Sequence, residues 1–81
     1  MSIEQIVADI KVKTGEAEDH RVEIKNQYEV LNTMLQESGG IRTREVDDTY
    51  KNIDRLFGIK AKLEAEVRVL KAKLMEILLD A

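Results

Sequence analysis

The chain lacks several kinds of residue on which many small folds depend. It contains no cysteine and no proline among its 81 residues. Without cysteine it can form neither a disulfide framework nor a thiolate metal site, and without proline no helix loses a backbone donor. Two tyrosines, one phenylalanine and no tryptophan leave little material for an aromatic core. These absences favour long helices over sheets or disulfide-stapled scaffolds.

Residues typical of enzyme active sites are also scarce. The chain has one histidine, its only serines are Ser2 and Ser38, and it has no glycine-rich phosphate loop. Nucleophilic triads and nucleotide-binding folds therefore lack their residues. Two carboxylate pairs, at positions 16 and 19 and at positions 45 and 48, have helical spacing for magnesium, but a hairpin separates them by about 30 Å. We therefore expect no enzyme, no cofactor and no metal.

Membrane and export signals are missing as well. No stretch approaches the roughly 18 apolar residues of a membrane span, and the N-terminus does not follow the basic-then-apolar layout of a signal peptide. We expect a cytoplasmic location and no membrane contact.

What is present is charge: 36% of residues are charged, the net charge is −3 and the mass is 9.3 kDa. A chain of this length makes one domain, residues 1–81. Two helices side by side would bury only a stripe of each, so association is expected to complete the core.

The second half carries the stronger pattern. Apolar residues recur from position 46 in alternating steps of three and four, which predicts one helix from about residue 43 to about residue 80. Thr43 stands where an N-cap is needed, and Glu45 in the first turn complements the helix dipole. Thr49 and Lys60 are the polar members of this row. The other members are Val46, Ile53, Leu56, Leu63, Val67, Leu70, Leu74, Ile77 and Ala81.

The first half repeats the pattern less strongly. Ser2 and Gln5 have capping-box spacing, and a helix is predicted over about residues 3–38. Gly15 follows Thr14, a residue suited to capping, so a break there is an open alternative, which would leave a short extra N-terminal helix over about residues 2–13. The predicted row is Ile3, Val7, Ile10, Thr14, Ala17, Arg21, Ile24, Tyr28, Leu31 and Leu35.

Gly39 and Gly40 lie almost at the midpoint of the chain. Because glycine suits the left-handed position that ends a helix, they predict a turn over residues 39–42. The fold class is therefore all-α: an antiparallel, coiled-coil-like helical hairpin. Apolar residues spill beyond the paired rows, so a homodimer forming a four-helix bundle is the expected assembly.

Folding about this turn places two cations, Arg21 and Lys60, at one level of the predicted seam. Buried charges need partners, because an uncompensated one costs several kcal/mol. The favoured interpretation is a salt-bridge network, within or between subunits, that fixes register. The alternative is a site for a phosphate or nucleotide, held by both cations together with His20.

The residues left over after the seam closes are candidates for partner binding. Tyr50 and Phe57 lie seven residues apart on one side of the second helix, and the chain ends in an apolar run. Arginines flank the Thr43 cap, where free backbone N–H groups could meet an acidic partner. The predicted contact residues are Arg42, Arg44, Tyr50, Phe57, Leu78 and Leu79.

We predict a non-enzymatic protein–protein interaction module, a regulator, adaptor or inhibitor, that acts as a homodimer or higher homo-oligomer and binds another protein. One alternative is a bundle that binds RNA or a small anion or nucleotide, although helical spacing spreads the basic residues around the cylinder, so a nucleic-acid groove is not evident. The other alternative is a structural coiled-coil assembly subunit.

Overall fold

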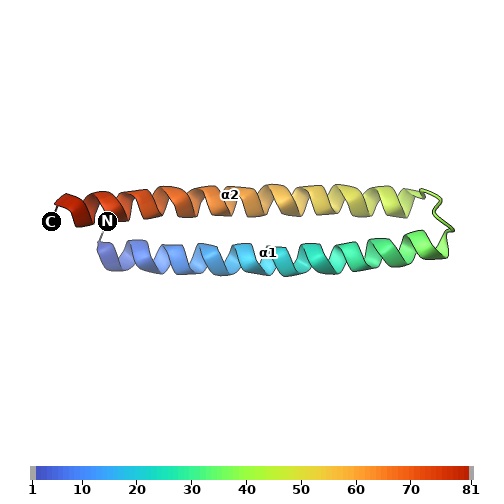
Figure 1. The fold of residues 1–81 in the computed structure, drawn as a ribbon, viewed down its shortest axis with the longest axis horizontal. Helices are drawn as coiled ribbons and strands as arrows, with labels where there is room; N and C mark the ends of the chain where they lie inside the picture. Colours follow the sequence, from blue (N-terminus) through green and yellow to red (C-terminus); the bar gives the residue numbers. More distant parts are fainter. Residues whose placement is uncertain (1, 81) are drawn as a thin grey trace.

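The protein is an antiparallel hairpin of two long helices (Figure 1). The computed structural model describes residues 2–80, with α1 at Ile3–Glu37 and α2 at Arg44–Asp80. The hairpin is a rod with extents of 62 × 14 × 14 Å. The predicted hairpin is confirmed, and its helix ends fall within one residue of their expected places. Over residues 2–80, no helical stretch combines the length and apolarity that a bilayer crossing requires.

The turn is closed by a Schellman motif. Ser38 caps α1, and the next two residues return their N–H groups to the last turn. Gly39 N donates to Gln36 O at 3.3 Å, and Gly40 N donates to Leu35 O at 2.7 Å. Both glycines have positive φ, +66° and +85°, which explains why this position carries a Gly-Gly step.

Both helices begin at the predicted caps. The Ser2 hydroxyl accepts a hydrogen bond from Gln5 N, and the Thr43 hydroxyl accepts one from Val46 N, each at 3.2 Å. Each cap satisfies one of the backbone donors that a helix start leaves without an intrahelical partner.

Helix α1 runs through Gly15 without a break. The alternative of a separate helix over residues 2–13 is therefore wrong. A glycine inside a helix costs about 1 kcal/mol relative to alanine, whereas a break would expose two further helix ends. Packing on both sides of Gly15, at buried Ala17 and at the Lys13–Glu66 contact between helices, keeps the helix continuous.

The row predicted for α2 is the row that the hairpin buries. Seven of its members are buried: Val46, Thr49, Ile53, Leu56, Leu63, Val67 and Leu70. Ala81, the last member of the predicted row, lies outside the described residues. The tightest packing lies near the turn, in a core cluster of Ile24, Leu31, Val46, Ile53 and Leu56.

The row predicted for α1 needs correction. Ala17, Ile24 and Leu31 are buried as expected, but Thr14, Arg21 and Tyr28 are exposed. The column that lies one residue before Thr14, Arg21 and Tyr28 is more buried than they are. Its members are Ile6, Lys13, His20, Gln27 and Met34. α1 thus presents one central row to two rows of α2, and long polar side chains at its edges reach water.

Candidate interaction surface

Three aromatic side chains, Tyr28, Tyr50 and Phe57, lie along one side of the hairpin, which we call the aromatic face. Tyr28 of α1 and Phe57 of α2 meet edge to face, with ring centres 6.5 Å apart and planes at 63°. Tyr50 shares their side because it precedes Phe57 by seven residues, two helical turns. Tyr28 and Phe57 remain 43% and 44% exposed. The hairpin therefore leaves this face only partly covered.

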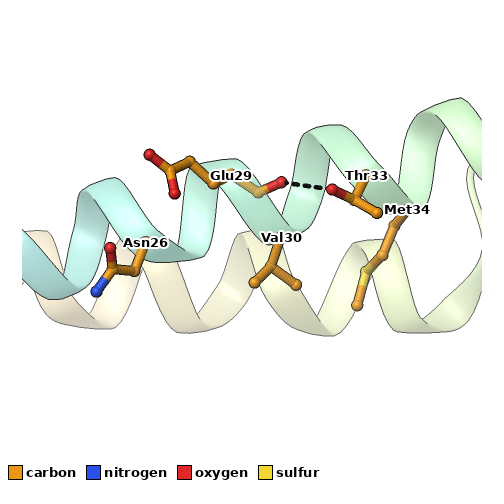
Figure 2. A pocket seen from close by; sticks show the side chains of 5 residues that line it. All are labelled: Asn26, Glu29, Val30, Thr33 and Met34. Carbon is orange, nitrogen blue, oxygen red and sulfur yellow. Dashed lines mark hydrogen bonds between the residues drawn. The ribbon is translucent and has the colours of Figure 1, made fainter.

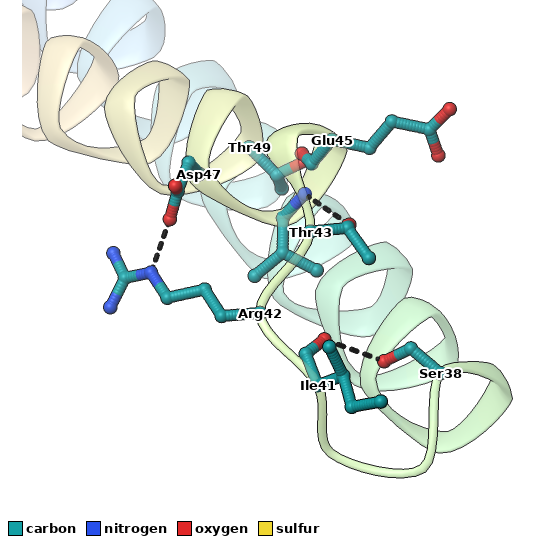
Figure 3. Close-up of polar contacts among 8 residues, drawn as sticks. Ser38, Ile41, Arg42, Thr43, Glu45, Asp47 and Thr49 are labelled. Atoms are coloured by element: carbon teal, nitrogen blue, oxygen red, sulfur yellow. Dashed lines mark hydrogen bonds and ion pairs between the residues drawn. The ribbon is translucent and has the colours of Figure 1, made fainter.

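Arg42 closes the aromatic face at the turn, where its guanidinium lies 4.9 Å from the centre of the Tyr50 ring. Arg42 also pairs with the Asp47 carboxylate (Figure 3). The hydrogen bond to Asp47 raises the pKa of Arg42 above its ordinary value. The cation–π contact and the ion pair hold one predicted contact residue against another. Arg44 begins α2 as an exposed side chain.

Short polar contacts fix the backbone around the turn. The Ser38 hydroxyl donates to Ile41 O at 2.8 Å (Figure 3). The Thr49 hydroxyl donates to Glu45 O, also at 2.8 Å, so a polar residue in the buried row has its hydrogen bond within α2. Within residues 2–80, no buried side-chain nitrogen or oxygen lacks a partner.

Four charged residues, Glu18, Arg21, Lys60 and Glu64, form a cluster on the same face, which we call the waist cluster. Arg21 donates hydrogen bonds from two nitrogens to the Glu18 carboxylate, at 2.6 and 2.9 Å, and Lys60 pairs with Glu64. The hydrogen bond from Arg21, assisted by the charge of Lys60, lowers the pKa of Glu18.

The waist cluster corrects part of the predicted polar layer. Lys60, predicted within the seam, keeps 26% of its side chain exposed, and the Arg21 side chain is 56% exposed and lies outside the apolar seam. Two cations and two carboxylates balance, so the arrangement works as a neutral ion-pair network. A bound phosphate would have to compete with both glutamates, and the anion site stays a prediction.

His20 belongs to the opposite face. It follows Lys13 by seven residues, and its Nδ1–H donates to Glu16 O at 2.7 Å. Lys13 joins the helices through Glu66 at 2.6 Å. This hydrogen bond raises the pKa of Lys13 and lowers that of Glu66. The structure therefore does not bring His20 into the cluster of Arg21 and Lys60.

A shallow hollow of about 390 Å³ lies along α1 on the turn side (Figure 2). Asn26, Val30 and Met34 point to one side of the helix, while the Glu29 side chain points away. All of the lining residues come from α1: Asn26, Glu29, Val30, Thr33 and Met34. A hollow bounded by one helix holds no convergent polar groups for a small ligand.

The open end of the hairpin, opposite the turn, is apolar and exposed. Leu79 is 79% exposed, and Leu78, Met75 and Ile3 are also exposed. Both residues predicted there, Leu78 and Leu79, are thus available for contact.

Sequence reasoning missed Tyr28 as a surface residue, because the periodicity placed it in the row of α1 that was predicted to be buried. A signal was present. Tyr28 follows Arg21 by seven residues, and a column that combines a tyrosine with an arginine is suited to the edge of a seam, where polar tips reach water.

Comparison with protein families, with curated proteins and with solved structures finds no match to this chain. Residues 2–80 contain no group of three or more histidine, aspartate or glutamate side chains placed to hold a metal ion.

Proposed function

We propose that the protein is a non-enzymatic helical interaction module that acts as a homo-oligomer and binds another protein, as a regulator, adaptor or inhibitor. The observation that carries this proposal is the aromatic face. Tyr28 and Phe57 touch each other yet leave more than two-fifths of each side chain in water. Completing the burial of a large apolar side chain contributes about 1.5–3 kcal/mol, and aromatic anchors of this kind dominate protein interfaces.

The ends of the rod supply a second contact region. At the open end Leu78 and Leu79 are exposed side by side, and at the turn Arg44 is an exposed cation next to Arg42, whose charge is paired with Asp47. We propose these ends for contact with a different protein, with Leu79 as the main anchor because it is the more exposed of the two leucines and Leu78 borders the aromatic face. Leu79→Glu tests this contact: capture of a partner by the natural chain, but not by the variant, supports it.

The paired cations favour this function over nucleic-acid or anion binding. Lys13, Arg21, Arg42 and Lys60 each pair with a carboxylate. A phosphate backbone is bound through cations that release counterions, and these four are already neutralised by neighbours.

Sedimentation equilibrium tests the self-association. We expect the natural chain to reach at least twice its monomer mass of 9.3 kDa and to lose this association in Phe57→Glu, with affinity at least about 100-fold weaker because a charge replaces an interface anchor. Val22→Glu is the matched control, since Val22 has the same 44% exposure and lies outside the aromatic face.

The outcomes separate the alternatives. A monomer at all concentrations would contradict the proposal. Masses that keep growing with concentration, as in filaments or ladders, would favour the structural coiled-coil subunit, because a closed dimer stops at two copies.

A further inference from the structure

The aromatic face changes character along the rod. Next to the turn it is apolar, with Tyr50, Tyr28 and Phe57. The waist cluster follows at mid-length. Beyond it, Leu78 returns the face to apolar side chains at the open end. A surface with such an order can distinguish the direction in which a partner lies on it.

The dimensions fit a partner that is also two helices wide. A rod of 62 Å by 14 Å presents a projected face of about 870 Å², so contact over the whole of two such faces is of the size of stable specific interfaces, roughly 1,200–2,000 Å² in total. A single helix would cover only part of this width. The second hairpin that matches in length and width is another copy of the chain.

Two closed arrangements bring this face against its own copy. In the first, the two-fold axis runs along the rod and both turns lie at the same end. In the second, the axis crosses the rod and the turns lie at opposite ends. In both, every neighbouring pair of helices is antiparallel, so helix direction alone does not choose between them.

The apolar residues choose the first arrangement. With both turns at one end, α1 of each copy lies over α2 of the other at the same level, so Tyr28 of one copy meets Phe57 of the other. With the turns at opposite ends, these aromatic residues instead face the levels of Thr14 and Lys71, which are polar. Placing the aromatic residues against polar ones forfeits burial of the largest apolar area on the face.

The charges choose the same arrangement. The waist cluster lies near the middle of the rod, so it meets its own copy in either case. When α1 lies over α2, Arg21 of one copy approaches Glu64 of the other. When α1 lies over α1, Arg21 approaches a second Arg21, and Glu64 approaches a second Glu64. Juxtaposed like charges disfavour the second arrangement.

We infer that a second copy of this chain covers the aromatic face in register, with both turns at the same end and the two-fold axis along the rod. This rests on the proposed function, since it specifies the geometry of that self-association. It makes the waist cluster an intersubunit ion-pair layer. It also sets two Leu78–Leu79 ends side by side, so that the module offers one doubled apolar tip.

Spin labels test the arrangement directly, because the chain has no cysteine and one introduced cysteine takes one label. Ile41→Cys places a label on an exposed side chain at the turn. Since packed helices lie about 8–10 Å apart, the same-end dimer gives a label separation of about 20–30 Å by double electron–electron resonance. Turns at opposite ends give about 60 Å, the length of the rod.

Val22→Cys is the control, because it lies near mid-length on α1, so its label separation stays well below the 62 Å length of the rod in both dimers. A short Val22 separation with an Ile41 separation near 60 Å overturns the inference and leaves the proposed function standing. A monomer in both samples overturns both. If Val30→Glu dissociates the dimer while Phe57→Glu does not, the opposite face is the interface and the inference fails.

Discussion

The half of the hairpin next to the turn and the half at the open end are built differently. In the turn half, Val46, Ile53 and Leu56 are no more than 2% exposed and belong to one core cluster. In the open half, Leu63, Val67 and Leu70 retain 8–9% exposure. Ile6 is the exception there, since it is almost fully buried.

The difference follows from what each half contains. The turn half has branched apolar side chains facing one another and a capped turn that holds the helices together. In the open half α1 supplies Ala17 to its central row, and a half-exposed ion pair, Lys13–Glu66, joins the helices. Exposed ion pairs contribute little to stability. The turn half therefore holds the two helices together more strongly than the open half does.

Truncating one leucine in each half tests the difference between the halves with the largest expected effect. We expect Leu56→Ala to lower the free energy of unfolding by about 3–4 kcal/mol and Leu70→Ala by about 2 kcal/mol, because the less enclosed site leaves a smaller cavity. Chemical denaturation at one fixed chain concentration measures both, since association adds to apparent stability. Equal losses would show that the two halves are packed equally well.

Two glycine substitutions, one at the turn and one in the open half, should change stability in opposite directions and by intermediate amounts. Gly40→Ala forces an alanine into a positive-φ conformation at the turn, which costs about 1–2 kcal/mol. Gly15→Ala, in the open half, should stabilise the protein by about 0.5–1 kcal/mol, because alanine is the better helix former and nothing lies within 4 Å of the added carbon. Thermal unfolding followed by circular dichroism measures both. A loss of stability in Gly15→Ala would show that the glycine serves a contact in the assembly.

The same two halves show how far sequence reasoning reaches. Gly39-Gly40, the Ser2 and Thr43 caps and the α2 row were all predictable, because each depends on local conformation or on one helix's period. The side of α1 that packs against α2 was not predictable. Its central row is flanked by two columns of mixed polarity, and the choice between them depends on contacts with α2, such as Lys13 with Glu66.

The candidate surface likewise contains residues that the sequence predicts and contacts that only the structure reveals. Phe57, Tyr50 and Arg42 were identified from spacing and position near the turn, and the structure adds that Arg42 lies over Tyr50. The pairing of Phe57 with Tyr28 needed the rotation of α1 about its axis, which no single-helix pattern specifies. Long polar side chains also choose their partners in three dimensions: Arg21 reaches Glu18 on its own helix rather than the seam.

The smallest expected effect concerns the ion pair of the open half and its dependence on pH. The hydrogen bond from Lys13 holds the pKa of Glu66 below its ordinary value of 4.5. The unfolded chain therefore binds the proton more readily, so this stabilisation is fully present above about pH 4.5 and is lost as the pH falls through the lower, folded pKa. We expect Glu66→Gln to melt slightly below the natural protein at pH 6 and to match it near pH 2. The double variant Lys13→Met, Glu66→Gln closes the cycle, and additive effects of the two single changes at pH 6 would show that the pair contributes nothing to joining the helices.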